Sequence, residues 1–220
     1  MIITLDGPAG AGKSSAARSL AARLGWCYMD TGAMYRALTL VALERGIPLE
    51  DAAAMAALAE ALRIEFRAGR VLVDGRDVSA EIRTERITAA TRPVADAPPV
   101  RAAMKHIQRR MAAGLDIVTE GRDQGSEVFP HADVKVFVTA SPEERARRRH
   151  REELARGSGL SLTEVLAAQA ARDDGDRSRS VGAMRAAADA VILETDGLAP
   201  EDVVDRLVAL IEARRGPRET

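Results

Sequence analysis

Five short stretches of the chain are largely apolar, and they predict β-strands buried in a parallel sheet. Stretches with apolar side chains at helical spacing separate them, as expected for strands that are joined by helical crossovers. This alternation predicts an α/β fold. The expected strands lie at residues 2–5, 26–29, 115–119, 134–138 and 191–194, and Val191, Ile192 and Leu193 are expected to be buried.

Helices are expected where apolar residues recur every three or four positions. Gly25 ends the first of them, and Asp51 is placed to cap the third. Pro98 and Pro99 are expected to interrupt a helical stretch in the middle of the chain. The expected helices span residues 14–24, 31–44, 51–62, 82–95, 100–113, 142–154, 161–171 and 200–214.

The expected strands are unevenly spaced along the chain. Residues 31–113 separate the second strand from the third, which is too long for a loop and predicts an inserted lobe. Within it, residues 63–77 alternate apolar and polar side chains around two glycines, which predicts a small antiparallel meander. A second, smaller insertion covers about residues 150–180. We therefore expect a single domain, residues 1–220, with a core of residues 1–30, 114–149 and 181–214 and disorder only at residues 216–220.

Composition limits the classes of function. Hydrophobic residues make up 46% of the chain, enough for a sizeable core, and the formal net charge is −1. A nearly neutral chain has no general attraction to nucleic acid or to acidic membranes, so we expect neither as a partner. Cys27 is the single cysteine, which excludes an internal disulfide. Because the sequence has no signal peptide and no long apolar stretch, we expect a cytoplasmic protein.

The candidate chemistry begins in the sequence GPAGAGKSS at residues 7–15, directly after the first expected strand. Gly7, Gly12, Lys13 and Ser14 match the pattern of a phosphate-binding loop. The glycines let backbone N–H groups turn toward an anion, Lys13 can bridge the β- and γ-phosphates, and Ser14 can ligate Mg²⁺. The helix that follows adds the positive end of its dipole. The loop predicts binding of ATP or GTP and leaves hydrolysis and transfer both open.

Two further polar motifs follow expected strands. DTGAMYR at residues 30–36 follows the second strand, and EGRD at residues 120–123 follows the third. Ligands bind outside the carboxyl ends of the strands in open α/β sheets, so we expect both motifs beside the phosphate-binding loop. The chain has no N-K-x-D stretch, which argues against a GTPase.

These motifs, together with FP after EGRD, TASPEERARRR and RDDGDRSR, resemble in order those of the bacterial cytidylate kinases over essentially the whole chain. The meander at residues 63–77 also resembles the enlarged nucleoside-monophosphate lobe of that family. The resemblance implies a P-loop three-layer fold with a five-stranded parallel sheet, an inserted acceptor lobe and a helical lid at about residues 150–180. It also implies transfer of the γ-phosphoryl group of ATP to CMP or dCMP with Mg²⁺, and we expect a monomer.

The resemblance assigns roles to positions of this sequence. It implies that Lys13, Arg122 and Arg172 are catalytic and that Ser14 holds the metal ion. The acceptor residues that it implies are Thr31, Arg36, Arg101, Arg122, Asp123, Arg172, Asp176 and Arg179. The ATP-binding residues that it implies are Gly7, Pro8, Ala9, Gly10, Ala11, Gly12, Lys13, Ser14 and Ser15.

Elementary chemistry supports some of these roles independently. A cytosine edge offers an amino donor and two acceptors, so the carboxylate of Asp123 and the guanidinium of Arg101 fit it. Uracil would instead place a carbonyl oxygen against Asp123. Phosphoryl transfer needs positioning and charge neutralisation by arginines more than a strong base. We therefore expect no catalytic histidine, and His106, His131 and His150 share no metal-ligand spacing.

Several residues keep a second interpretation. Arg36 alone could be a surface arginine, and Asp30 could support Mg²⁺ or cap a helix. Arg122 and Asp123 could pair with each other. The basic run at residues 143–152 could be a solvated helix face or could lead into a lid over ATP.

Some positions depart from the family's pattern. Gln124, Ser126 and Glu127 stand where relatives usually have apolar or Thr-like residues, which leaves the geometry after EGRD open. Thr91 is a candidate for a base-contacting serine that has no clear counterpart here. RDDGDRSR alone has the composition of an ordinary charged turn. A non-enzymatic ATP-binding module and an adenylate- or shikimate-type kinase are the alternatives, and the acceptor motifs favour a cytidylate kinase over both.

Overall fold

The structure is a computed structural model that describes residues 1–67, 69–155, 157 and 159–215. The expected disorder of residues 216–220 falls outside the described residues. The chain divides into two compact units, Met29–Gly114 and a unit composed of Met1–Tyr28 and Leu115–Thr220. No helix of the described part of the chain is both long and apolar enough to cross a membrane.

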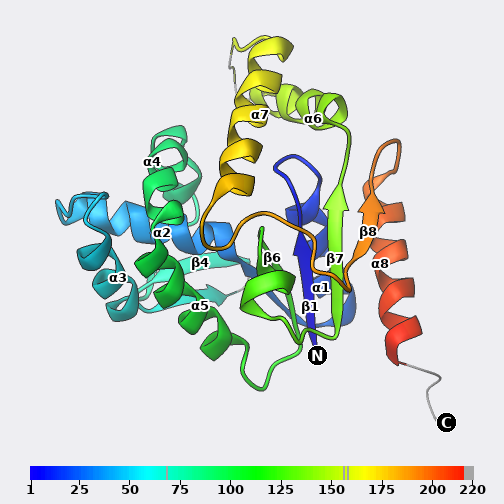
Figure 1. Ribbon diagram of the computed structural model, residues 1–220, viewed down its shortest axis with the longest axis horizontal. Helices are drawn as coiled ribbons and strands as arrows, with labels where there is room; N and C mark the ends of the chain where they lie inside the picture. Colours follow the sequence, from blue (N-terminus) through cyan, green and yellow to red (C-terminus); the bar gives the residue numbers. More distant parts are fainter. Residues whose placement is uncertain (68, 156, 158, 216–220) are drawn as a thin grey trace. The chain divides into compact units, whose positions relative to one another are not determined.

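A five-stranded parallel sheet in the order β2-β6-β1-β7-β8 confirms the predicted α/β fold (Figure 1). The central strand β1 pairs with β6 through Ile3 and Val118, and with β7 through Ile3 and Val134. The strands are β1 (Ile2–Asp6), β2 (Cys27–Asp30), β6 (Ile117–Glu120), β7 (Val134–Thr139) and β8 (Val191–Glu194).

Two helices pack with this sheet around one apolar core. Helix α1 (Lys13–Leu24) contacts β1 and β6, and α8 (Pro200–Arg215) contacts α1 and β7. Their apolar side chains meet those of the strands, and each large one that is fully buried stabilises the fold by about 1.5–3 kcal/mol. The largest fully buried members of this core are Ile3, Leu5, Leu20 and Leu207.

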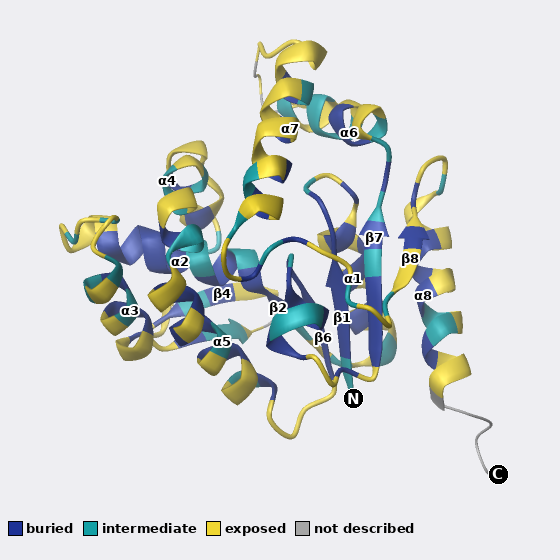
Figure 2. Ribbon diagram, in the orientation of Figure 1, coloured by how far each residue is buried: buried dark blue, intermediate teal, exposed yellow. Residues whose placement is uncertain are grey.

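The prediction that the last strand is buried was wrong for two of its residues. Val191 and Ile192 are 43% and 53% exposed, whereas Leu193 is buried (Figure 2). The reason is that β8 is the outermost strand at one edge of the sheet. An apolar run has the same appearance in the sequence whether its strand is central or at an edge.

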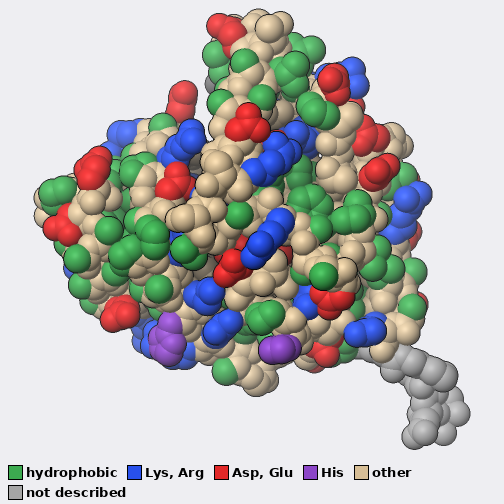
Figure 3. Space-filling model, viewed as in Figure 1, with side chains coloured by type: hydrophobic (Ala, Val, Ile, Leu, Met, Phe, Trp, Pro, Cys, Tyr) green, Lys and Arg blue, Asp and Glu red, His purple; other side chains and the backbone are tan. Residues whose placement is uncertain are grey.

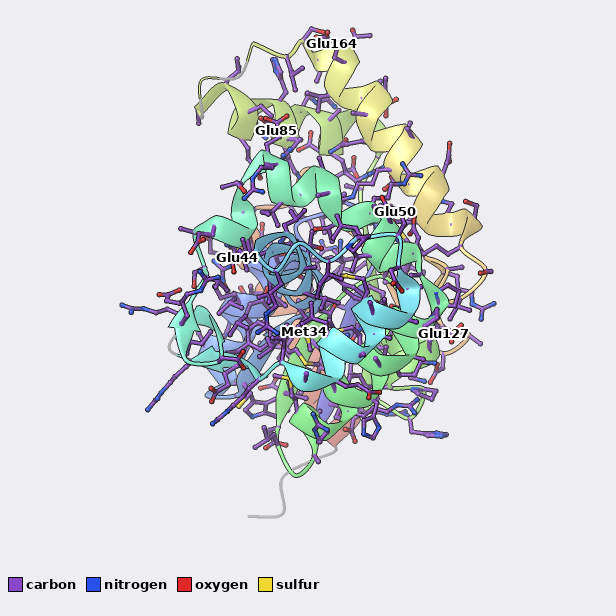
Figure 4. All side chains as sticks on the ribbon, turned by 90° about the vertical axis from the view of Figure 1, so that its left-hand side faces the viewer. Met34, Glu44, Glu50, Glu85, Glu127 and Glu164 are labelled. Carbon is purple, nitrogen blue, oxygen red and sulfur yellow. The ribbon has the colours of Figure 1, made fainter. Side chains whose placement is uncertain are left out.

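Two helices that contact each other follow β7: α6 (Pro142–Ala155) and α7 (Leu162–Ser178) (Figure 1). Ser161 caps α7 in a capping box with Glu164, which is labelled in Figure 4. Helix α7 is longer than predicted, because most of RDDGDRSR continues the helix instead of forming a charged turn. Ion pairs along this stretch, such as Arg177 with Asp174 at 3.2 Å, are compatible with the helix.

The unit Met29–Gly114 has its own core and a second sheet. Strands β3 (Ile64–Arg67), β4 (Arg70–Val73) and β5 (Arg76–Asp77) form an antiparallel sheet. The helices are α2 (Thr31–Glu44), α3 (Ala52–Ala61), α4 (Glu85–Asp96) and α5 (Pro98–Ala112), with a 3₁₀ turn at Glu81–Arg83. Met34, labelled in Figure 4, is fully buried together with Leu38, Met55, Ile87 and Met104.

The break between α4 and α5 lies at Ala97, one residue before the position predicted from the proline pair. Pro98 and Pro99 occupy the first turn of α5 instead of preceding it. Backbone N–H groups in a first turn have no partner within the helix, so prolines are tolerated there.

Candidate functional site

The phosphate-binding loop connects β1 to α1 and depends on its glycines. Gly7, Gly10 and Gly12 have φ angles of 135°, 79° and 88°, a region that other residues rarely adopt. A Cβ atom at Gly7 would lie 2.0 Å from the carbonyl oxygen of Val138. The loop therefore requires glycine at this position both for its backbone angle and for its contact with β7.

Lys13 is buried at the start of α1, and its side chain turns back over the loop. Its Nζ donates a hydrogen bond to the carbonyl oxygen of Pro8 at 2.6 Å. Burial and, to a smaller extent, the charge of Arg122 lower the pKa of Lys13 to about 7, although Glu120 and Asp6 act in the opposite direction. A phosphate beside this ammonium group would favour its charged form.

Ser14 and Glu120 together offer oxygen ligands for a divalent cation. The Ser14 hydroxyl donates to Glu120 Oε1 at 2.7 Å, and the Tyr28 hydroxyl donates to the same oxygen at 3.3 Å. A hydroxyl and one carboxylate fit Mg²⁺, which takes few protein ligands beside phosphates and water. No cluster of three or more His, Cys, Asp or Glu side chains suited to a metal occurs among the described residues. Glu120 was missed as a site residue, although it is the first letter of EGRD.

Asp6 is a second residue of the candidate site that was not predicted from the sequence. Its carboxylate accepts hydrogen bonds from the backbone N–H groups of Gln124 at 2.8 Å and Gly125 at 2.7 Å. Burial raises the pKa of Asp6 to about 7, although these two hydrogen bonds partly oppose the shift. The end of β1 is thereby attached to the turn that follows Arg122 and Asp123. The signal in the sequence was an acidic residue directly before Gly7.

The unusual residues after EGRD are accommodated in a π-helical turn, Gln124–Val128. The side-chain oxygen of the buried Gln124 accepts a hydrogen bond from the Thr119 hydroxyl at 2.9 Å. Glu127, labelled in Figure 4, pairs with Arg185 at 3.4 Å. The negative charge of Glu127 is thus partly compensated by an arginine.

An ion-pair cluster joins the end of β6 to the end of α7. Nε of Arg122 donates to Asp176 Oδ2 at 2.8 Å, and Arg179 contacts Asp176 Oδ1 at 2.5 Å. Burial alone would raise the pKa of Asp176, but Arg122, Arg179 and Arg172 lower it below its usual value. The structure therefore brings together three of the predicted acceptor residues, namely Arg122, Asp176 and Arg179.

The two remaining predicted residues of this unit lie near the cluster. Arg172 is exposed on α7, and its charge lowers the pKa of both Lys13 and Asp176. Asp123 is buried, and its charge contributes to the raised pKa of Asp6. One alternative was that Arg122 pairs with Asp123. In the structure Arg122 pairs with Asp176 instead.

In the other unit, Arg36 is held by the residue that caps α2. Asp30 accepts a hydrogen bond from the backbone N–H of Ala33 at 2.8 Å, which confirms its interpretation as a helix cap. Arg36 lies 3.4 Å from the same carboxylate and is largely buried, so its interpretation as a surface arginine is wrong. Its buried Nε has no hydrogen-bond partner among the described residues, which leaves a donor for a ligand.

The other predicted acceptor residues of that unit are also buried. Arg101 donates to the carbonyl oxygen of Ala95 at 2.9 Å, and its guanidinium lies 5.8 Å from the centre of the Tyr35 ring. Thr31 is buried at the start of α2. The hydroxyl of Thr91 donates to a backbone carbonyl oxygen one helical turn earlier, at 2.6 Å.

The arginines of the basic run on α6 differ in their exposure to solvent and in the groups that they contact. Arg147 and Arg151 are exposed, whereas Arg145 is buried. Arg148 donates to the side chain and the backbone of Thr195 at 2.9 and 2.6 Å, and the hydroxyl of Thr195 donates to Ala11 in the phosphate-binding loop at 3.2 Å. Blue and red side chains are interspersed over the face drawn in Figure 3, in agreement with the small net charge.

Comparison with solved structures supports the fold. The crystal structure of an uncharacterized protein from Eubacterium ventriosum is similar with a TM-score of 0.54 at 12% identity, over 96% of this chain and 98% of that one. TT1252 from Thermus thermophilus gives a TM-score of 0.50 at 22% identity, over 99% and 98% of the two chains. At these identities the likeness concerns the fold alone.

Comparison of sequences identifies the family. The family model described as cytidylate kinase matches residues 3–213. A cytidylate kinase of Rhodopirellula baltica is 50% identical over 96% of this chain and 92% of its own length. One of Carboxydothermus hydrogenoformans is 44% identical over 96% and 97% of the two chains. The chain therefore belongs to the cytidylate kinase family.

Proposed function

We propose that the protein transfers the γ-phosphoryl group of ATP to CMP or dCMP, forming ADP and CDP or dCDP in pyrimidine nucleotide metabolism. The observation that carries this proposal is the pairing of Arg122 and Arg179 with one carboxylate, that of Asp176, in the same unit as the phosphate-binding loop. A loop for the donor phosphates and fixed arginines for an acceptor phosphate are what phosphoryl transfer between two anionic groups requires. Membership of the cytidylate kinase family supports the choice of acceptor.

The donor side of the proposed site is the loop at residues 7–15 together with Lys13. Its N–H groups would surround the β- and γ-phosphates, and the Lys13 ammonium would bridge them. Ser14 and Glu120 would hold Mg²⁺, Ser14 directly and Glu120 directly or through water. When bound, Mg²⁺ neutralises charge on the phosphates.

The acceptor side has a cationic part and a base-reading part. Arg36, Arg122, Arg172 and Arg179 would bind the phosphate and sugar side of CMP, with Thr31 and Asp176 beside them. Asp176 would hold Arg122 and Arg179 in place, because a carboxylate shared by two guanidinium groups limits their rotamers. Asp123 and Arg101 would read the cytosine edge.

The residues of the chain promote transfer chiefly by neutralising and orienting two anionic groups. Lys13, Arg122 and Arg172 would stabilise the charge that spreads over the transferring phosphoryl oxygens. Proximity of donor and acceptor would supply much of the remaining rate. No side chain is required as a strong base.

We also propose how the chain is organised around this reaction. Residues 31–113 would form the acceptor lobe, residues 150–180 the lid, and residues 1–30, 114–149 and 181–214 the core. Closure of lobe and lid would exclude water and so protect ATP from hydrolysis. The protein would act as a cytoplasmic monomer.

An acceptor panel tests the proposed function. In a coupled assay, ADP release should depend on an added nucleoside monophosphate and should be fastest with CMP or dCMP, slower with UMP and slowest with AMP. Equal ADP release with and without acceptor would contradict the proposal and favour an ATPase or a regulatory ATP-binding module. Calorimetry on the same sample should detect CMP binding.

A further inference from the structure

Helix α7 buries polar side chains along one face. Gln169, Asp173 and Asp176 are all buried, and Val165 continues the same face toward the start of the helix. Their spacing places them on one stripe of α7, and α6 packs against α7. Arg172, which our proposed function places at the transferring phosphate, lies on the same helix.

Arg145 of α6 is the cation opposite this stripe. Its side chain is 5% exposed and lies 2.7 Å from Asp173 Oδ2. The same terminal nitrogen donates to the carbonyl oxygen of Ala9 in the phosphate-binding loop at 2.9 Å. Nε donates to the carbonyl oxygen of Ala140, directly after β7, at 3.2 Å. One guanidinium group therefore joins the loop, the end of β7 and α7.

A second contact links the same segments. The side-chain amide of Gln169 donates to the backbone carbonyl oxygen of Arg145 at 3.2 Å. A Cβ atom at Gly10 would lie 2.9 Å from Nε2 of Gln169 and 3.2 Å from Cβ of Arg145. The glycine thus lets the tip of the phosphate-binding loop pack directly against α6 and α7.

The burial of Asp173 makes this arrangement sensitive to one charge. Both of its carboxylate oxygens are buried without a hydrogen bond of good geometry in the part of the chain that the structure describes. Arg145 is the cation that contacts the buried carboxylate of Asp173. The charge of Asp173 also acts to raise the pKa of Arg122. Removing one partner of such a pair is strongly unfavourable, because the other charge stays buried.

We propose that Arg145 is a positioning residue that couples the phosphate-binding loop to α7 through Asp173. The proposal rests on the proposed function and adds to it. Arg145 would not contact the nucleotide, because its guanidinium is directed at Ala9, Ala140 and Asp173. A triphosphate that fixes Ala9 and Gly10 thereby also fixes α7, which carries Arg172 and Asp176 to the reacting phosphates.

The neighbouring pair Asp173 and Asp174 provides a matched test. Asp173→Asn removes the buried charge with little change of shape, whereas Asp174→Asn makes the same change at a side chain that is 77% exposed. We expect Asp173→Asn to lower kcat about tenfold to hundredfold, as for a small misplacement of reacting groups, and to change the KM for ATP less than about threefold. Asp174→Asn should change kcat less than about twofold.

Hydrogen exchange separates coupling from general damage and does not depend on turnover. A non-hydrolysable ATP analogue should slow amide exchange in both residues 7–15 and α7 of the unaltered protein and of Asp174→Asn. In Asp173→Asn it should slow exchange in residues 7–15 alone. Protection of α7 by the analogue in Asp173→Asn would overturn the proposal, whatever the acceptor panel shows.

Arg145→Lys is a second variant in case Asp173→Asn does not fold. It keeps a positive charge opposite Asp173, but a single ammonium group cannot reproduce the geometry of the guanidinium fork. We expect loss of analogue-induced protection in α7, while Arg147→Lys, at an exposed position of the same helix, should retain it. Equal protection in the two lysine variants would overturn the proposal. In the double variant with Asp173→Asn, the losses in kcat should be far from multiplicative.

Discussion

Replacing Lys13 with methionine should lower kcat for CMP phosphorylation by about 10³-fold, the scale measured when a fixed group that stabilises transition-state charge is removed. Methionine retains most of the side-chain volume, so the loop keeps its packing while it loses the ammonium group. The variant should also melt no lower than the unaltered protein, because the ammonium is costly to bury, as its pKa of about 7 shows. Initial rates and a thermal melt measure both effects.

Lys135→Met is the matched control for this prediction. Lys135 is also buried, and it also donates to a carbonyl oxygen five residues earlier, that of Pro130 at 2.5 Å, in addition to Asp189. Its loss should reduce stability and leave kcat within about threefold at a temperature where the protein is folded. Similar losses of kcat in the two variants would contradict a special role for Lys13.

The unaltered protein and Lys13→Met should also differ in how ATP binding depends on pH. Because the pKa of Lys13 is about 7, a growing share of its side chain is neutral above pH 7. A triphosphate favours the ammonium form, so ATP binding at pH 8 should take up a proton, and affinity should fall as pH rises from 7 to 9. Calorimetry in two buffers of different ionisation enthalpy should detect this uptake, and Lys13→Met should lack it.

Replacing Asp123 with asparagine should lower the preference for CMP over UMP about tenfold to hundredfold, the value of one good base-edge contact. The aspartate can only accept a hydrogen bond, so it favours the amino group of cytosine and opposes the carbonyl oxygen of uracil. The asparagine amide can turn its NH₂ group toward that oxygen. The ratio of kcat/KM for the two acceptors measures the change, and KM for ATP should stay within about threefold.

Glu127→Gln is the control for a carboxylate in the neighbouring turn. Glu127 pairs with Arg185 at the surface, so its neutralisation should leave the CMP to UMP ratio unchanged within about twofold. An unchanged ratio in Asp123→Asn would show that another residue reads the base. A changed ratio in both variants would assign the preference to the general negative charge of the turn.

The fold and the phosphate-binding loop were predictable because their signals are local. The loop follows from Gly7, Gly12, Lys13 and Ser14 within a few residues, and the five strands follow from short apolar runs. The start of α2 was also predictable, because Asp30 caps it within one turn. In each case the residues that form the recognisable pattern also form the loop, the strand or the helix cap that the pattern predicts.

The residues that were missed make contacts far along the chain. Asp6 binds backbone N–H groups at residues 124 and 125, and Ser14 binds Glu120, so neither partner can be recognised by spacing. The length of α7 was underestimated because its charged end is stabilised by partners such as Arg122 and Arg145 outside the helix. Tertiary partners of this kind override the turn-like composition of residues 172–179.

Transfer of label from ATP to CMP is the most direct test of the central claim that this protein joins a donor site to an acceptor site. With γ-³²P-labelled ATP, CMP and Mg²⁺, the label should appear in CDP in an amount equal to the ADP formed, with little inorganic phosphate. Label found in inorganic phosphate while CMP stays unlabelled would contradict the account, because ATP would then be hydrolysed and not used to phosphorylate an acceptor.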